Sequence, residues 1–127
     1  MLDHVSIGVP DMTAAAPFWD AVMAALGYPL VGESDVWRGY GARADADQPD
    51  RTYLSLRVGP ASPSACHFAF RAPDRAAVDA AWAVGCAAGG TDDGAPGLRP
   101  AYHPSYYAAF LRDPAGNRIE CVCHRRA

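Results

Sequence analysis

One short segment occurs twice in this chain, and that repeat limits what the chain can fold into. HVSIGVPD begins at His4 and HFAFRAPD begins at His67, so each copy has a histidine, five further residues and then Pro-Asp. The same offset of 63 residues matches further pairs, which are Ala14 with Ala77, Trp19 with Trp82, Ala24 with Ala87, Ala25 with Ala88 and Gly27 with Gly90. A fixed period of half the chain length indicates two copies of one supersecondary unit. Each copy then holds an imidazole at the same place.

Length and composition predict one domain, residues 1–127, that binds neither nucleic acid nor a membrane. Half of the 127 residues are apolar, which is enough for a core, and the net charge of −3 provides no basic surface for nucleic acid. No apolar run approaches the roughly 20 residues that a membrane helix needs. The N-terminal MLDHVSIGV lacks the basic start of a secretory signal. We therefore expect a soluble cytoplasmic protein.

Hydrophobic periodicity predicts a strand, a helix and three strands in the first half of the chain, and the repeat predicts the same plan for the second half. In a first module, residues 1–58, it predicts strands over 2–9, 29–33, 36–41 and 52–58, and a helix over about 10–26. Pro17 in this helix predicts a late start or a kink. In a second module, residues 65–124, it predicts a helix over 74–88 and strands over 65–72, 106–112 and 118–124. The Gly- and Pro-rich residues 91–104 are expected to form a long functional loop.

Glu120 adds a third candidate ligand to the two histidines. It lies within the last predicted strand and faces away from the apolar positions, and a carboxylate there needs a partner or a solvated cavity. His4 and His67 face away from the large apolar residues of their strands. If the modules pack with pseudo-twofold symmetry, the imidazoles converge, and two histidines with one carboxylate form a facial triad for Fe(II), Mn or a similar ion. Taken singly, each residue is more typical of an ordinary hydrogen-bonded or solvated strand position than of a metal ligand.

The segments LDHVSIGVPD, HFAFRAPD and FLRDPAGNRIE resemble those of the vicinal oxygen chelate superfamily, and the resemblance covers nearly the whole chain. That superfamily contains glyoxalase I, extradiol dioxygenases, fosfomycin-resistance transferases and bleomycin-binding proteins. The resemblance implies an α+β fold of two tandem βαβββ modules whose curved mixed sheet surrounds a cavity. It also implies one divalent ion (Fe, Mn, Zn or Ni) held by His4, His67 and Glu120. A homodimer is implied too, with modules paired within or between chains, so that His4 could complete the partner's site.

Three departures separate the chain from the well-known activities of the superfamily. Glyoxalase I takes a fourth ligand from the position where this chain has Ser55, and serine is a poor metal ligand. Extradiol dioxygenases and fosfomycin transferases have a tyrosine ten residues before the glutamate, where this chain has Phe110. The fosfomycin enzymes also use a lysine, a residue that this chain lacks. The resemblance thus leaves the reaction class open between a lyase or isomerase and an oxygenase.

Other candidate site residues lie near the predicted last hairpin and on the strands. His103, within RPAYHPSYY at residues 99–107, and Tyr106 are predicted to act as general acid or base, although these residues are also typical of sheet packing and loop capping. The residues predicted to contact substrate are Tyr53, Ser55, Phe110 and Arg118. Arg57, Arg71 and Arg118 share the cavity side or its rim, where an arginine can bind an anionic substrate or simply face solvent.

Three functional hypotheses follow from these residues. The first is a divalent-metal enzyme that acts on a small oxygenated molecule. The second is a metal-free protein that sequesters a small molecule, with an apolar pocket lined by Trp37, Tyr40, Tyr53 and Tyr106. The third is a regulatory or structural protein whose metal triad is empty. Metal content of the purified protein, with a His67→Ala control, separates the first hypothesis from the others.

Overall fold

The predicted order of a strand, a helix and three strands occurs twice in the structure, a computed structural model that describes all 127 residues. The first module contains β1 (His4–Val9), α1 (Met12–Ala25), β2 (Leu30–Ser34), β3 (Trp37–Gly41) and β4 (Tyr53–Val58). The second module contains β5 (His67–Arg71), α2 (Arg75–Ala87), β6 (Thr91–Leu98), β7 (Tyr107–Arg112) and β8 (Arg118–Cys123). The α+β fold of two βαβββ modules is therefore confirmed.

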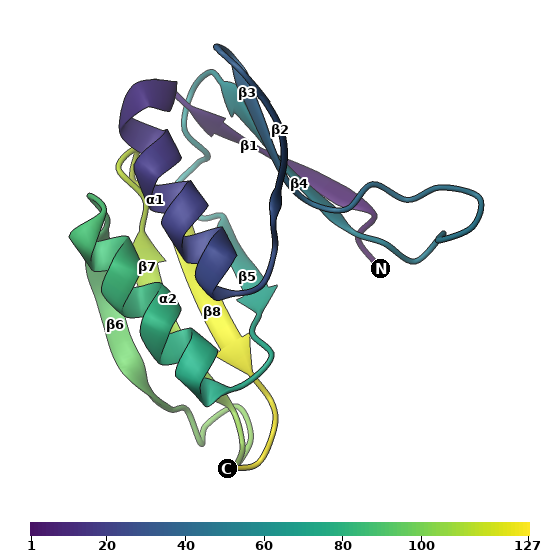
Figure 1. Cartoon of the computed structure of the whole chain (residues 1–127). Coiled ribbons are helices and arrows are strands. Elements are labelled where there is room, and N and C mark those ends of the chain that lie inside the picture. The colour runs from purple at the N-terminus through teal and green to yellow at the C-terminus, as the bar shows by residue number, and fades with distance from the viewer.

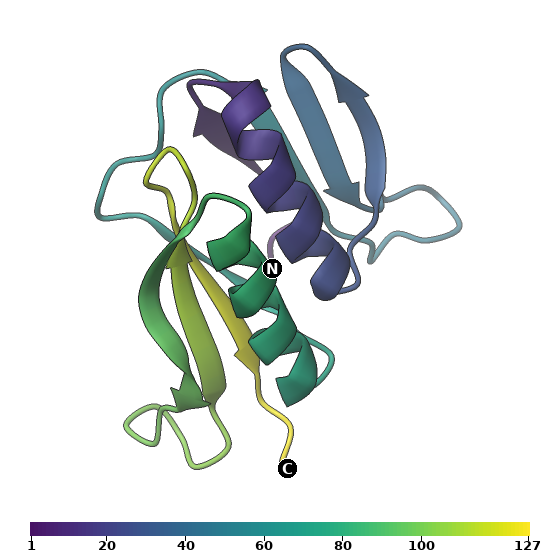
Figure 2. The same ribbon diagram turned by 60° about the vertical axis from the view of Figure 1, so that its left-hand side comes forward.

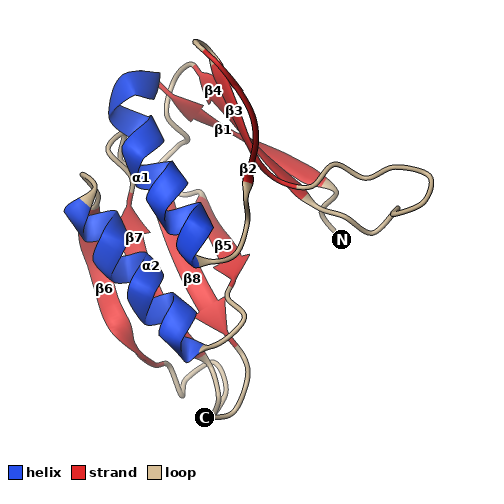
Figure 3. Ribbon diagram, viewed as in Figure 1, coloured by secondary structure: helices blue, strands red, loops and turns tan.

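Each module forms one four-stranded mixed sheet. The strand orders are β1-β4-β3-β2 and β5-β8-β7-β6, and in each sheet the first strand is parallel to the last while the other pairs are antiparallel. The helices α1 and α2 lie side by side in the middle of the molecule, with one sheet on the outer side of each (Figures 1 and 2). Figure 3 shows the same arrangement coloured by secondary structure. One face of each sheet is left uncovered by helices.

The hydrophobic core lies between the helices and the inner faces of both sheets. Its largest buried side chains include Phe18 and Trp19 of α1, with Ile7 and Leu56 from the first sheet. Because strand side chains alternate between faces, the residues next to these core positions lie on the uncovered faces. We call these the first open face, which carries His4, Ser6, Tyr53, Ser55 and Trp37, and the second open face, which carries His67, Ala69, Phe110, Arg118 and Glu120.

The turn between β7 and β8 fixes the second module to the first. Trp19 of α1 donates its indole N–H to Asp113 Oδ2 at 3.0 Å, and Asn117 Nδ2 donates to the carbonyl of Gly8 at 3.0 Å. Asp113 and Asn117 are both almost fully buried. Buried polar groups need such partners, so these bonds set the orientation of the modules as well as satisfying the turn.

Local structure differs from the expectations in two places. Of the late start or kink expected from Pro17, the late start is wrong, because Asp11 caps the helix and accepts hydrogen bonds from the backbone N–H groups of Thr13 and Ala14. Pro17 lies inside α1 with its ring exposed, where it removes one backbone hydrogen bond. Residues 91–98 are not loop but strand β6, whose pairing with β7 is interrupted at Gly94, a residue with a φ of +152°. Such bulges hide the period-two pattern of a strand.

Neither helix is both long enough and apolar enough to cross a membrane.

Candidate functional site

The second open face brings together two of the three predicted metal ligands. His67 begins β5, and Glu120 lies on the neighbouring β8 opposite Ala69. His67 Nε2 is 3.5 Å from Glu120 Oε2, and the imidazole is 56% exposed whereas the carboxylate is 4% exposed. Two ligands that each lie about 2.1 Å from one ion are roughly 3.4 Å apart at a tetrahedral angle. The pair therefore has the spacing of two ligands of a single ion.

Tyr106 fixes the orientation of the Glu120 carboxylate. Its hydroxyl donates a short hydrogen bond to Glu120 Oε1, which leaves Oε2 directed at His67. Burial, followed by this hydrogen bond and the negative charge of Glu120, raises the pKa of Tyr106 well above its usual value. The phenol therefore stays protonated at neutral pH and acts as a donor to the carboxylate.

The loop between β6 and β7 places His103 against the ring of Tyr106, with 5.3 Å between ring centroids. The backbone N–H of Ser105 donates to His103 Nδ1 at 3.1 Å, and His103 Nε2 is 2.9 Å from Nδ1 of His124. Because Nδ1 accepts a hydrogen bond, neutral His103 carries its proton on Nε2 and donates it to His124. Both ring nitrogens of His103 are thus engaged away from Glu120.

His124 is a residue of this cluster that the sequence interpretation missed. Its ring stacks on His103 at 5.2 Å and meets the edge of Tyr106 at 5.0 Å. A signal was available, since His124 follows Glu120 by four residues and even offsets along a strand point to one face.

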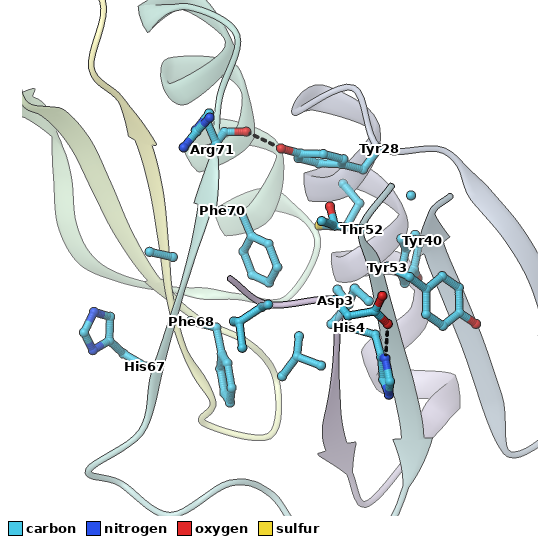
Figure 4. Close-up of a pocket in the computed structure, with 16 residues that line it drawn as sticks. Asp3, His4, Tyr28, Tyr40, Thr52, Tyr53, His67, Phe68, Phe70 and Arg71 are labelled. Carbon is cyan, nitrogen blue, oxygen red and sulfur yellow. Dashed lines mark hydrogen bonds and ion pairs between the residues drawn. The ribbon is translucent and has the colours of Figure 1, made fainter. Parts of the chain in front are cut away.

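His4 lies on the first open face and does not approach the other two predicted ligands. Its side chain is 64% exposed, and its Nδ1 is 2.6 Å from Asp3 Oδ1. In Figure 4, His4 and His67 point away from each other, with Phe68 and Phe70 between them. Accordingly, the chain contains no cluster of three or more His, Cys, Asp or Glu side chains with metal-binding geometry. The contact with Asp3 orients the imidazole and leaves Nε2 free.

Ser55 occupies the position in the first module that Glu120 occupies in the second. Ser6 is opposite Ser55 just as Ala69 is opposite Glu120. Ser55 Oγ accepts a hydrogen bond from Trp37 Nε1 at 2.8 Å, so the hydroxyl holds an indole.

The indole of Trp37 lies against two glycines of the first open face. A Cβ on Gly32 or Gly39 would come within 2.8 or 2.6 Å of its ring atoms. Tyr53 lies beside it at 6.3 Å between ring centroids and a 30° tilt, so the two rings form an aromatic platform.

The remaining predicted substrate contacts divide between the two faces. Phe110 lies opposite Glu120, and Arg118 lies opposite His67 with its Nε 3.5 Å from Asp93 Oδ2. Tyr53 and Ser55 lie on the first open face. The second open face thus gathers His67, Glu120 and Tyr106 with Phe110 and Arg118.

A cavity of about 480 Å³ lies between the edges of β1 and β5 (Figure 4). Both His4 and His67 border it, but Glu120 does not. Of the four aromatic residues expected to share one pocket, Tyr40 and Tyr53 border this cavity. Trp37 lies on the first open face and Tyr106 on the second, so the structure does not bring all four together.

Comparisons with known proteins agree with this architecture. Residues 1–121 match the model of the Glyoxalase/Bleomycin resistance protein/Dioxygenase superfamily. A glyoxalase/bleomycin resistance protein from Albidiferax ferrireducens T118 is 29% identical with a TM-score of 0.79, over 96% of this chain and 97% of that one. A family enzyme from Burkholderia phytofirmans PsJN is 23% identical with a TM-score of 0.67, over 94% and 95%.

A lactoylglutathione lyase from Agrobacterium tumefaciens is 21% identical with a TM-score of 0.63, over 96% of this chain and 92% of that one. At that identity the likeness shows the shared fold. No match was found among curated proteins.

Proposed function

Because the chain belongs to the glyoxalase/bleomycin resistance protein/dioxygenase superfamily, we propose that it is a cytoplasmic enzyme that binds one divalent ion and acts on a small oxygenated molecule. The ligands are His67, Glu120 and His4. The observation that carries the proposal is the 3.5 Å approach of His67 Nε2 to a buried carboxylate whose other oxygen is already held. A set of two imidazoles and one carboxylate suits Fe, Mn, Zn or Ni.

The third ligand is proposed to come from a second copy of the chain. His4 lies apart from the pair, is largely exposed and has a free Nε2. In a homodimer, the first open face of one protomer would cover the second open face of its partner. Each of two equivalent sites would then combine His67 and Glu120 with His4 of the partner subunit.

The proposed site gives each residue a distinct task. A bound ion polarises a substrate oxygen and stabilises negative charge that develops on it. Tyr106 holds Glu120 Oε1 and keeps Oε2 available, while His103 and His124 hold the ring of Tyr106 in place. Phe110 packs on the apolar part of the substrate from the second open face. Trp37 and Tyr53 pack on it from the first open face that covers the site, and together the three rings exclude water. Because Tyr106 stays a protonated donor to Glu120, we assign it the positioning of this carboxylate.

Metal titration of the chelator-treated protein by calorimetry tests the proposal. We expect about one Mn²⁺, Fe²⁺, Zn²⁺ or Ni²⁺ ion per chain for at least one of these metals. His67→Ala should lose this binding, and Asp35→Asn, which removes an exposed carboxylate elsewhere, should keep it. A folded wild-type protein with no stoichiometric metal binding would falsify the enzyme proposal.

Mixed dimers test where His4 acts. If His4 serves the partner's site, a dimer of one His4→Ala chain and one His67→Ala chain retains a single intact site. If His4 served its own chain, the same mixed dimer would have none. Refolding the two variants together and measuring bound metal per dimer therefore distinguishes the two arrangements. Each variant alone should bind none.

A metal-free binding protein is the second candidate function. It is favoured by the aromatic platform of Trp37 and Tyr53, which occupies the face where Ser55 stands in place of a carboxylate. Such a protein would sequester a flat apolar molecule and would bind it equally well before and after chelator treatment.

A further inference from the structure

Each open face carries an arginine that lies on aromatic rings and has no acidic partner. The Cζ atom of Arg99 lies 5.5 Å from the ring centroid of Phe110. The Cζ atom of Arg43 lies 4.9 Å from the ring of Tyr53 and 5.7 Å from that of Trp37. Neither guanidinium has a carboxylate oxygen within 4.0 Å.

Arg112, Arg118 and Arg38 contact carboxylates, whereas Arg57 and Arg71, which also lie on the open faces, do not. Arg112 and Arg118 share Asp93 at 3.6 and 3.5 Å. Arg38 contacts Asp20 and Glu33. Arg99 is half-buried and Arg43 is exposed, and both stay without a carboxylate partner in a chain whose net charge is −3.

Arg99 is held in a fixed geometry close to the candidate metal ligands. Phe110, on which it lies, is paired across the strands with Glu120. The guanidinium donates from Nη2 to the carbonyl of Ala95 at 2.7 Å and from Nη1 to that of Leu98 at 3.4 Å. An arginine has five N–H donors, so three remain for another partner.

Two glycines of β6 make room for this stack. A Cβ on Gly97 would come within 3.1 Å of Arg99 Nη1, and one on Gly94 would come within 3.0 Å of the Phe110 ring. The glycines that interrupt β6 therefore let a planar cation lie flat beside Phe110. A side chain held in this way loses little freedom on binding, which favours affinity for a planar anion.

We propose that Arg99 binds an oxyanion group of the substrate, a carboxylate or a phosphate. Arg43 supplies a second cation from the first open face, which covers this site in the proposed homodimer. The substrate class is then a small planar acid whose ring packs on Phe110 or on the Trp37 platform. The assignment of this acid as a substrate rests on the proposed function. The anion site itself requires no metal.

Binding of four probes to the full-length protein tests this proposal, both after chelator treatment and with Mn²⁺ added. The probes are benzoate, its neutral analogue benzamide, phenyl phosphate and inorganic phosphate, each titrated to millimolar concentration. We expect benzoate or phenyl phosphate to bind at least about tenfold more tightly than benzamide, since charge-assisted hydrogen bonds supply the difference. Added salt should weaken the binding of the anions.

Arg99→Gln should raise the Kd for the anions by about tenfold or more and leave benzamide binding unchanged. Arg99→Lys, which keeps the charge but loses the planar fork, should lie between the two. Arg126→Gln removes an exposed arginine near the C-terminus and should behave as wild type. Thermal unfolding of each variant verifies that it is folded.

Equal affinity for benzoate and benzamide, no binding of any probe, or unchanged anion binding by Arg99→Gln would overturn the proposal. Anion binding that depends on Arg99 in a protein that binds no metal would support it and contradict only the proposed enzyme. Comparison of benzoate with the two phosphates identifies which oxyanion the site prefers. If inorganic phosphate binds as tightly as phenyl phosphate, the proposed packing of the substrate ring on Phe110 or on the Trp37 platform is wrong.

Discussion

The two open faces share one backbone register but hold different chemistry. Glu120 is paired with Ala69 on the second open face, and Ser55 is paired with Ser6 on the first open face. In each case an aromatic side chain donates a hydrogen bond to the oxygen at this position, the phenol of Tyr106 in one and the indole of Trp37 in the other. Only the carboxylate carries charge. In the proposed site, the second copy of the repeat supplies His67 and Glu120 to the ion, whereas the first supplies His4 and an aromatic surface for the rest of the substrate.

A second pair of equivalent positions explains how the first face makes room for its platform. Gly39 is paired with Ser55 just as Phe110 is paired with Glu120. Where the second module has a phenylalanine ring, the first has no side chain, and the indole of Trp37 fills the space. Both faces thus carry an aromatic ring at this place, but the ring comes from a different strand position in each module.

The largest expected effect comes from removing the negative charge of Glu120, which its counterpart Ser55 does not carry. Glu120→Gln keeps the shape of the side chain and an acceptor for Tyr106 but removes the anionic ligand. We expect metal affinity to fall by at least about 100-fold, more than the typical loss for an outer-shell partner. Calorimetric titration with Mn²⁺ or Zn²⁺ measures the loss.

The matched variant on the first face is Ser55→Ala. It should leave metal affinity within about twofold of wild type, because the hydroxyl is engaged by Trp37 and supplies no ligand. If Ser55→Ala weakened metal binding as strongly as Glu120→Gln, the two faces would not differ in the way described above.

A smaller effect is expected from filling the space beneath the platform. Gly39→Ala places a Cβ against the Tyr53 hydroxyl and 2.6 Å from Trp37 Cζ2, so both rings must shift. Overpacking of this kind lowers the free energy of unfolding by about 1–3 kcal/mol. Urea unfolding followed by circular dichroism measures it.

Gly59→Ala is the control, because a Cβ at that position has no heavy atom within 4 Å. Its free energy of unfolding should stay within about 0.5 kcal/mol of wild type. Equal stability of the two variants would mean that Trp37 does not lie tightly against the sheet.

The repeat in the sequence was sufficient to predict both modules and the equivalence of His4 and His67. The resemblance to the vicinal oxygen chelate superfamily identified Ser55 as the counterpart of Glu120, and the strand register agrees with it. These predictions succeeded because period-two alternation determines which face a strand residue occupies.

The rest depended on contacts that periodicity does not encode. The glycine at position 94 interrupts β6 and hides its period-two pattern, so periodicity does not predict that Arg99, one residue beyond this strand, lies against Phe110. The hydrogen bond from Trp37 to Ser55 joins two strands and depends on the indole rotamer. The separation of His4 from Glu120 is set by how the modules pack, which the repeat alone leaves undetermined.

The smallest expected effect concerns pH and distinguishes the donors on the two faces. Tyr106 can lose a proton and Trp37 cannot in the accessible range, so of these two donors only Tyr106 should contribute to the alkaline dependence of stability. Burial and the bond to Glu120 raise the pKa of Tyr106 in the folded protein above its ordinary value of about 10. The folded state therefore retains a proton that the unfolded state releases above about pH 10, and stability falls as the pH rises through that range.

Tyr106→Phe removes this contribution and should make the decline in unfolding free energy above about pH 10 less steep, by up to one proton. Tyr40, whose pKa is also raised mainly by burial, keeps its own contribution in both proteins. Urea unfolding at a series of alkaline pH values measures the slope, with Tyr102→Phe, an exposed ring beside Tyr106, as the matched variant. An identical slope in wild type and Tyr106→Phe would mean that the phenol is not held as a protonated donor to Glu120, and the second face would then lack the device that directs its carboxylate at His67.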